Sequence, residues 1–296
     1  MDLKRLRYYC AIVEHGQISK AAEALHIAQP ALSQRLKELE EMVGATLIIR
    51  KAQHWQITEA GQLLYSRAKN MIRSYDDLVA EFQDFVYPYD SMMTIGISSI
   101  CFSYLAKVIV KMQKEYPQIH FRILSGDIAY LEGLIAAKKI DFAIYHNPTQ
   151  NSELNCVKLH PSTYSLLYAK GIFPHHPVCK LKDLKNVSII IPRRSIGGSG
   201  YEWLLNKLQE SLGYNPIIID SPDVHTLSLL LDYGLQAAAI FPTSEIHTYR
   251  YMHYDSSIID ELGFVIQPYL VHYKDQYLSQ AARVVIENII CDYAVQ

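Results

Sequence analysis

The pattern of apolar and polar positions near the amino terminus predicts three consecutive helices. The first is expected over residues 3–15, where apolar residues recur at helical spacing: Leu3, Leu6, Cys10 and Val13. A short second helix is expected over residues 20–25, with Ser19 as its N-cap. The third begins at Gln29-Pro30, since proline is tolerated in a first turn, and its apolar stripe is Leu32, Leu36, Leu39 and Val43. Two helices separated by a break of three residues predict a helix-turn-helix.

The polar face of the third helix carries side chains that suit the edges of DNA bases. Glutamine can form paired hydrogen bonds with adenine, and arginine or lysine with guanine. Serine, lysine and backbone N–H groups can hold phosphates. Residues 46–50 and 54–57 then predict two strands of a β-wing, with Arg50 and Lys51 near its tip. The alternative interpretation is a helical bundle with a solvated polar face.

A long helix is expected from about residue 59 to 86, with Thr58 as its N-cap. Its apolar positions alternate steps of four and three: Leu64, Ala68, Met71, Tyr75, Leu78, Phe82 and Phe85. This spacing is typical of the seam of a two-helix coiled coil, so the helix is expected to pair two copies of the chain. The alternative is a helix that packs on its own chain. The acidic pairs Asp76-Asp77 and Glu40-Glu41 are interpreted as solvated faces.

Beyond a hinge at residues 88–92, strands and helices alternate, which favours parallel sheets. The expected strands span residues 93–97, 120–125, 142–145, 164–169, 187–191, 216–220, 237–241 and 264–273. The expected helices span residues 102–115, 128–138, 201–212, 224–233 and 276–293.

Charge is distributed unevenly along the 296 residues. Residues 1–75 hold 11 basic and 7 acidic groups, a net charge of +4, and the remainder carries −6 of the total of −2. A basic end on an acidic body suggests that this end meets polyanions. The five cysteines are odd in number, scattered and without a CxxC pair, which suits a reducing compartment. No apolar run is long enough for a membrane span, so a cytoplasmic protein without membrane contact is expected.

The stretch AAEALHIAQPALSQRLKELEEMVGATLIIR, followed by ITEAG, resembles the N-terminal domain of LysR-type transcriptional regulators. The resemblance covers residues 1 to about 60 without gaps. It implies a recognition helix over residues 29–42. The residues it implies for DNA contact, with the wing-tip Lys51, are Lys20, Gln29, Pro30, Ala31, Ser33, Gln34, Arg35, Lys37, Arg50 and Lys51. The position before Gln29 is commonly serine in the family and is Ala28 here, so a hydroxyl that would cap the helix is missing.

The rest of the chain resembles the effector domain of the same family more loosely. The markers are Ile95-Gly96-Ile97, Ile140-Asp141-Phe142-Ala143-Ile144, and Leu231-Asp232-Tyr233-Gly234-Leu235 leading to Phe241-Pro242. The implied fold is α/β, with an N-terminal winged helix-turn-helix, a long linker helix and a two-lobed periplasmic-binding-protein-like effector domain. The corresponding parts are residues 1–58, 59–87 and 88–296. Within the last part, lobe one is expected at 91–161 plus 269–296, and lobe two at 162–268.

A ligand is expected between the lobes, because open parallel sheets bind ligands beyond their carboxyl strand ends, at helix N-termini. The candidate contacts are Ser98, Ser99, Cys101, Gly126, Tyr145, Arg193, Arg194, Ser195, Asp223, Val224 and Phe241. The segment RRSIGGSG joins two fixed cations to a flexible backbone, which suits a carboxylate or a phosphate. It matches no P-loop, and a surface loop is the alternative.

The resemblance implies a bacterial DNA-binding regulator, in which the anionic effector expected between the lobes would change oligomer geometry and promoter activity. The expected partners are double-stranded DNA, a small-molecule effector such as a carboxylate, a second copy or a tetramer of the chain, and RNA polymerase; no cofactor is expected. One alternative is a thiol-based redox-responsive regulator of the same fold, for which Cys156 and Cys179 would be considered. Another is a solute-binding protein without DNA function. No catalytic motif such as HExxH or GxSxG is present, and neighbouring His175-His176 make a poor metal site.

Overall fold

The structure is a computed structural model, and it describes residues 1–51, 54–87, 89, 92–174, 176–192, 199–221, 223–246, 254–262 and 266–295. Side chains are not described at residues 50, 51, 54 and 199–201. The chain divides into two compact units, Met1–Phe85 and Val86–Gln296. The long helix predicted as a separate linker is therefore grouped with the first unit.

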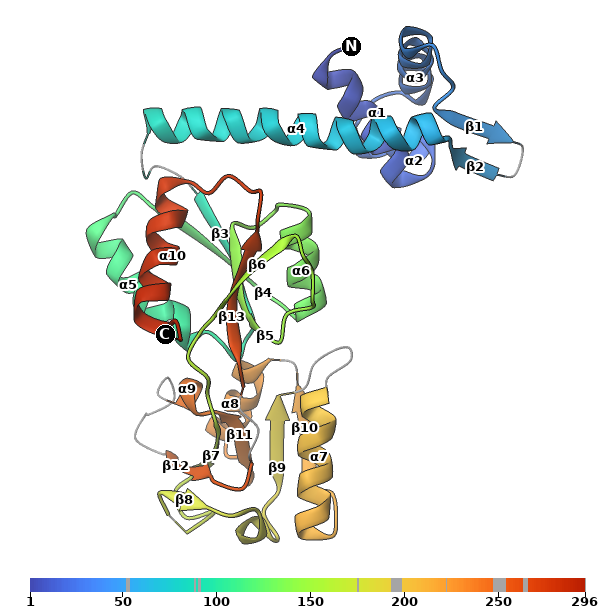
Figure 1. Ribbon diagram of the computed structural model, residues 1–296. Coiled ribbons are helices and arrows are strands. Elements are labelled where there is room, and N and C mark those ends of the chain that lie inside the picture. The colour runs from blue at the N-terminus through green and yellow to red at the C-terminus, as the bar shows by residue number, and fades with distance from the viewer. Residues whose placement is uncertain are drawn as a thin grey trace. The chain divides into compact units, whose positions relative to one another are not determined.

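The first unit is a winged helix-turn-helix followed by a long helix (Figure 1). Its elements are α1 Leu3–His15, α2 Ile18–Ala24, α3 Gln29–Val43, β1 Ile48–Lys51, β2 His54–Ile57 and α4 Glu59–Val86. The expected order of elements is thus confirmed, with β1 and β2 paired antiparallel. The prediction for Ser19 was wrong: α2 begins one residue before it, after Gln17, which makes no side-chain cap bond.

The core of this unit lies where α1, α2 and α3 meet, around the buried Tyr9, Ile12, Leu32 and Leu36. The first half of α4 packs on α1, where Ala68 lies against Leu6 and Cys10. Thr58 caps α4 as expected, because the Gly61 N–H donates to its Oγ1 at 2.9 Å. The start of α4 is therefore a fixed part of the helix-turn-helix unit.

The second unit consists of two α/β lobes. Lobe one is built on a sheet in the order β4-β3-β5-β13-β6. Its strands are β3 Met92–Ile97, β4 His120–Ser125, β5 Phe142–His146, β6 Leu154–Lys158 and β13 Pro268–Tyr273. Its helices are α5 Ser103–Glu115, α6 Ile128–Ala136 and α10 Gln280–Tyr293.

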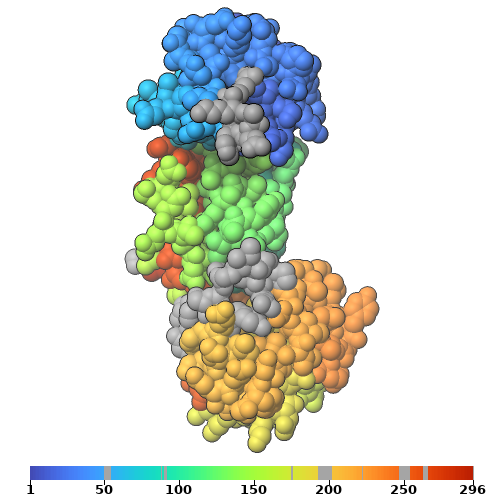
Figure 2. Space-filling view, turned by 90° about the vertical axis from the view of Figure 1, so that its right-hand side faces the viewer, coloured from blue at the N-terminus to red at the C-terminus, as the bar shows by residue number. Residues whose placement is uncertain are grey.

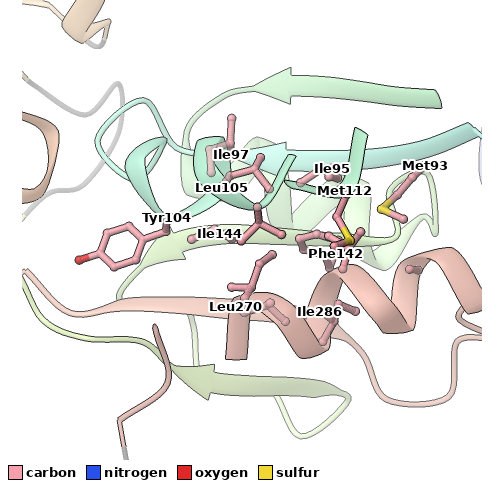
Figure 3. Packing of buried hydrophobic residues seen from close by; sticks show 14 of the residues in the cluster. Met93, Ile95, Ile97, Tyr104, Leu105, Met112, Phe142, Ile144, Leu270 and Ile286 are labelled. Atoms are coloured by element: carbon pink, nitrogen blue, oxygen red, sulfur yellow. The ribbon is translucent and has the colours of Figure 1, made fainter. Parts of the chain in front are cut away.

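Side chains alternate between the two faces of the lobe-one sheet, as the pleat requires. Ile144 of β5 and Leu270 of β13 point to the face covered by α5 and α10, where Leu105 and Ile286 pack on them (Figure 3). The neighbouring positions on β5 and β13 point to the opposite face, where they meet Leu131 of α6. Both faces of the lobe-one sheet are therefore buried.

Lobe two is built on a sheet in the order β10-β9-β11-β7-β12-β8. Its strands are β7 Tyr164–Ala169, β8 Val178–Cys179, β9 Ile189–Pro192, β10 Ile217–Ser221, β11 Ala238–Pro242 and β12 Tyr254–Ile259. Its helices are the 3₁₀ helix η1 Leu181–Leu184, α7 Ser199–Leu212, α8 Val224–Asp232 and α9 Thr243–Ile246. The clusters around α7 and α8 lie on opposite faces of this sheet.

The chain passes from lobe one to lobe two near residues 159–163 and returns near residues 266–268. The two passages meet where Ser162 and Ile266 exchange backbone hydrogen bonds of 2.9 and 2.8 Å. In the space-filling view, green and red segments from the two ends of this unit form one lobe, and amber to orange segments form the other (Figure 2). Lobe two is thus inserted into lobe one.

The expected parallel pairing holds for β3, β4 and β5 and for β9, β10 and β11, but the sheet of each lobe is mixed. Strands β3, β4 and β5 are parallel, but β13 runs antiparallel to both β5 and β6, and β7 runs antiparallel to β11 and β12. The antiparallel strands lie next to the passages between the lobes, where a returning chain enters its sheet from the opposite end. Strands β6, β8 and β12 were not predicted, and α10 begins at Gln280 rather than 276, because Ser279 caps it.

Candidate functional site

The polar face of α3 is open to solvent, while its apolar face is buried as far as Leu39; Val43, the last residue of the predicted stripe, is exposed. Leu32, Leu36 and Leu39 are the buried residues of this helix. The predicted DNA contacts lie on the other face: Gln29, Pro30, Ala31, Gln34, Arg35 and Lys37 are exposed, and Ser33 is half-buried. Lys20 is exposed on the preceding helix α2. These side chains can therefore reach into a groove of DNA while α3 stays folded.

The start of α3 lacks a side-chain cap, as the sequence predicts. Ala28 is its N-cap and makes no side-chain hydrogen bond, and Pro30 lies in the first turn. The free N–H groups of this turn and the helix dipole favour an anion there, such as a phosphate of DNA. Arg50 and Lys51 end β1 in the wing, and their side chains lie outside the described part.

A shared carboxylate holds two arginines beside α3. Glu38 Oε2 lies 2.9 Å from Arg35 Nη1 and 3.6 Å from Arg5 Nη2. The hydrogen bond from Arg35 holds the pKa of Glu38 below its usual range. A groove of about 310 Å³ opens here, and it is lined by Asp2, Lys4, Arg5, Tyr8, Ile27, Ala31 and Arg35. Lys4 and Arg5 were missed from the sequence, because only the fold brings the start of α1 to the start of α3.

The predicted seam of α4 divides into two parts. Ala68 is buried on α1, and Leu64 is half-buried in the same contact, so both serve the chain's own fold. The later positions are exposed in the single chain: Met71, Tyr75, Leu78, Phe82 and Phe85. An apolar row of this kind can bury itself against a second helix.

In the second unit, the carboxyl ends of β3 and β4 place Ser98, Ser99 and Gly126 at one edge of lobe one. Ser98 is buried, and its N–H donates to the Ile144 carbonyl at 2.9 Å. The Gly126 N–H donates to the Ile97 carbonyl at 3.2 Å. Of the predicted lobe-two contacts, Arg193, Arg194 and Ser195 lie outside the described residues.

Four further ligand candidates are packed in the cores of the lobes. Cys101 lies in the α5 cluster, Tyr145 in the α6 cluster, and Val224 and Phe241 in the α8 cluster. The Tyr145 hydroxyl donates to Glu132 Oε1 at 3.2 Å. These four side chains are therefore core residues and present almost no surface to solvent. Asp223 instead caps α8, accepting from the His225 and Thr226 N–H groups at 3.1 Å each.

Two carboxylates have roles that the sequence did not predict. Glu40, interpreted as solvated, accepts from the backbone N–H groups of Leu47 and Ile48 at 2.8 and 3.2 Å, so it anchors the wing. Glu245 of lobe two accepts two hydrogen bonds from Ser103 of lobe one. A glutamate right after a buried strand and Pro242 was the available signal for Glu245.

The environments of three of the thiols, those of Cys10, Cys156 and Cys179, disfavour thiolates. Burial raises the pKa of Cys10 and of Cys179 to about 11, and burial also raises the pKa of Cys156. Cys156 belongs to β6 in lobe one and Cys179 to β8 in lobe two.

Within the described ranges, no group of three or more His, Cys, Asp or Glu side chains is placed to hold a metal ion. None of the described helices is both long and apolar enough to cross a bilayer.

Comparison with known families and structures accounts for both units. Residues 3–62 match the family described as bacterial regulatory helix-turn-helix protein, lysR family, and residues 91–291 match the LysR substrate binding domain. The HTH-type transcriptional regulator BsdA of Bacillus subtilis (strain 168) is 26% identical over 286 residues, covering 96% of this chain and 98% of that protein. AlsR of the same organism is 24% identical over 246 residues, covering 81% of this chain and 78% of AlsR.

Solved structures agree on the fold. A full-length OxyR variant from Pseudomonas aeruginosa has a TM-score of 0.63 at 17% identity, covering 98% of this chain and 95% of that chain. CbnR, a LysR family transcriptional regulator, has a TM-score of 0.59 at 17% identity, covering 100% of both chains. The two matched domains together span most of the sequence, and their order is that of a DNA-binding transcriptional regulator with an effector-binding domain. The chain therefore belongs to the LysR family of bacterial helix-turn-helix regulators.

Proposed function

We propose that α3 enters the DNA major groove with the segment from Gln29 to Lys37, while Lys20, Arg50 and Lys51 contact phosphates. The observation that carries this proposal is the exposed polar face of α3, opposite the buried Leu32, Leu36 and Leu39. Gln29, Ser33, Gln34 and Arg35 offer the hydrogen-bonding groups that distinguish base pairs in that groove. Lys4, Arg5 and Arg35, which line the groove on the protein surface beside α3, attract DNA phosphates in addition.

Two variants separate base readout from phosphate binding. Gln29→Ala is expected to reduce the preference for a selected site over other sequences by about 5- to 150-fold, the cost of one lost bidentate base contact. Lys20→Ala is expected to weaken binding to all sequences alike and to lower the slope of log K against log salt by about 1. Binding sites are first selected from fragments of the source genome, and affinities are measured by fluorescence anisotropy at several salt concentrations.

The control is Lys114→Ala, which removes an equal charge from an exposed position in lobe one. It is expected to leave DNA affinity unchanged. Equal affinity of the unaltered protein for selected and random DNA would contradict specific readout by α3.

We further propose that the second half of α4 pairs two copies of the chain. Met71, Tyr75, Leu78 and Phe82 would form the contact, because they are exposed and continue the heptad spacing. Two copies would present two α3 helices to the half-sites of an inverted repeat. In this arrangement residues 1–58 bind DNA, residues 59–87 pair the copies, and residues 88–296 bind the effector.

For the effector, we propose a small anionic molecule, such as a carboxylate, bound between the two lobes. Ser98, Ser99 and Gly126 stand at the expected edge of lobe one, and by sequence Arg193, Arg194 and Ser195 follow β9 of lobe two. The effector would alter oligomer geometry, and with it promoter activity and any contact with RNA polymerase. It can do so only if it binds two arrangements of the protein with different affinity.

Titration calorimetry of the full chain against carboxylates and aromatic acids tests the effector site. We expect one class to bind, and we expect Ser99→Ala and Arg193→Ala each to weaken it. Absence of binding across the whole set would contradict an anionic effector. The redox-responsive alternative receives no support, because the pKa values of Cys10, Cys156 and Cys179 are all raised.

A further inference from the structure

A buried carboxylate joins the two lobes of the second unit. The N–H and the Oγ–H of Ser103, the first residue of α5, both donate to Glu245 Oε1, at 3.0 and 2.6 Å. Glu245 belongs to α9 in lobe two, and only 3% of it is exposed. Glutamate is almost never buried to this extent unless it is paired. The Ser103–Glu245 contact is therefore a specific link between the lobes.

Helix α5 depends on this link for its cap. Its own N-cap, Phe102, makes no side-chain hydrogen bond. The first turn of a helix has free N–H groups and the positive end of the dipole, so it favours a carboxylate. Helices α6 and α8 receive one from their own N-caps, Asp127 and Asp223. Helix α5 differs from both, because its carboxylate comes from the other lobe.

Both sides of the Ser103–Glu245 contact are anchored next to the passages between the lobes. On the lobe-two side, Thr243 N–H donates to the Thr163 carbonyl at 2.7 Å, which holds α9 to the first passage. On the lobe-one side, the Tyr104 hydroxyl donates to the His160 carbonyl at 2.7 Å. Both anchors lie on the first passage, so a change in the angle between the lobes that moves α5 relative to α9 would strain the link.

We propose that Glu245 is a positioning residue that sets the angle between the lobes by capping α5, and that it excludes anions from this helix N-terminus. The second part rests on the proposed effector function and sharpens it: the anionic group of the effector binds at Ser98, Ser99 and Gly126, before the first turn of α5, and not at the N–H group of Ser103. A group that binds beside Ser103 is a hydrogen-bond donor or neutral, because Glu245 already supplies the negative charge.

Hydrogen exchange of the full-length protein, with no DNA or effector added, tests the link. Glu245→Ala is expected to raise the exchange of amides in the first turn of α5 and in α9 by about tenfold or more, because a hydrogen bond to a charged group is lost. Asp141→Asn is the matched control. Asp141 is a partly buried carboxylate of lobe one, and it accepts from the Thr94 N–H at 2.7 Å within its own lobe. Its replacement should affect β3 and leave α9 unchanged.

A double-mutant cycle separates a shared contact from two independent defects. The double variant Ser103→Ala/Glu245→Ala should show no faster amide exchange in the first turn of α5 than Glu245→Ala alone, because the two residues act through one link. Glu245→Ala combined with Asp141→Asn should be additive. Unchanged exchange of the first turn of α5 in Glu245→Ala, or additivity of the Ser103 and Glu245 variants, would overturn the positioning role.

Formate tests the exclusion of anions. In Glu245→Ala the vacated N-terminus of α5 is expected to bind formate. Formate should then restore part of the protection of the first-turn amides of α5 from hydrogen exchange, whereas sodium chloride at equal concentration should not. In the unaltered protein formate should have no effect at this turn. Lack of any response to formate in the variant would overturn the exclusion. Because none of these measurements uses DNA or an effector, their failure is distinguishable from failure of the proposed regulator function.

Discussion

The hydroxyl of Tyr9 on α1 donates to the carbonyl of Gly61 in the first turn of α4, at 2.8 Å. The Cα of Gly61 faces the wing so closely that an added Cβ would lie 2.3 Å from the Leu47 carbonyl oxygen and 2.7 Å from Ile57 Cγ1. Three elements of the DNA-binding unit thus meet at one glycine. These contacts at Gly61 fix the direction of α4 relative to α1 and the wing.

We expect Gly61→Ala to destabilise the first unit by about 1–3 kcal/mol, because the backbone of β1 and α4 must move apart to admit a methyl group. Hydrogen exchange of α1–α3 peptides over a urea series measures the loss. Gly133→Ala in α6 is the control, since its Cβ would meet nothing within 4 Å and alanine is favoured in a helix. Equal stability of the two variants would contradict the tight contact at Gly61.

Leu78→Asp is expected to dissociate paired copies of the chain, because it places a charge in the apolar row of α4. Leu63→Asp is a closely matched control: each leucine is 61% exposed on the same helix, but Leu63 lies off the heptad row. Sedimentation velocity across a concentration series measures the assembly. A dimer that survives Leu78→Asp and dissociates in Leu63→Asp would show that another face of α4 is used.

Glu38→Gln is expected to raise DNA affinity several-fold at low salt. The change removes a negative charge from the recognition helix and releases Arg35 from its carboxylate partner, while Arg5 keeps its ion pair with Asp2 at 3.2 Å. Fluorescence anisotropy with selected DNA at two salt concentrations measures the gain, which should shrink at high salt. Glu14→Gln changes the net charge equally but lies at the other end of α1, where it pairs with Lys69. A matching gain in that variant would mean that net charge alone is responsible.

Burial raises the pKa of Glu245 above the ordinary 4.5, and the two bonds from Ser103 only partly oppose this. A carboxyl whose pKa is higher in the folded state favours folding below its unfolded pKa, and this contribution is lost as pH rises through the folded pKa. The difference in melting temperature between Glu245→Gln and the unaltered protein should therefore become more positive as pH rises from about 4.5 to 7.

The assignment of this pH dependence to Glu245 depends on its neighbours. The described titratable groups around the Ser103–Glu245 contact are Tyr104, Cys101, Tyr293 and His160. The Tyr293 hydroxyl donates to the Ser103 carbonyl at 3.5 Å, and the His160 carbonyl accepts from Tyr104. Phenols and thiols titrate well above this range. His160 is common to the variant and the unaltered protein, so its contribution cancels in the difference between their melting temperatures. Glu115→Gln, an exposed carboxylate at the end of α5, is the control and should show no such trend.

The DNA-binding unit could be predicted closely, because its signals are local. The stripe of α3, the proline in its first turn and the glycine at residue 44, which adopts φ of 69°, all lie within one short segment. The error at Ser19 has a local cause as well: Ile18 is buried in the core, so the helix starts early enough to place it there.

Features that depend on distant parts of the chain could not be predicted. The antiparallel direction of β13 follows from a return passage about 100 residues after the first one, and strand patterns carry no information on direction. Glu40 resembles any solvated glutamate until the wing folds back onto it. Four ligand candidates were chosen because they follow strand ends, yet only side-chain direction decides whether such a residue faces a ligand or a core.

The insertion of lobe two into lobe one has a consequence for biosynthesis. Strand β13 lies between β5 and β6, and it leaves the ribosome after all of lobe two. The earlier strands β3, β4 and β5 must therefore wait, with an open hydrophobic edge, while the inserted lobe is translated and can fold first. A nascent chain released before residue 268 would have a complete DNA-binding unit and an incomplete lobe one. We expect chaperones and proteases to act on such a chain at the exposed edge of lobe one.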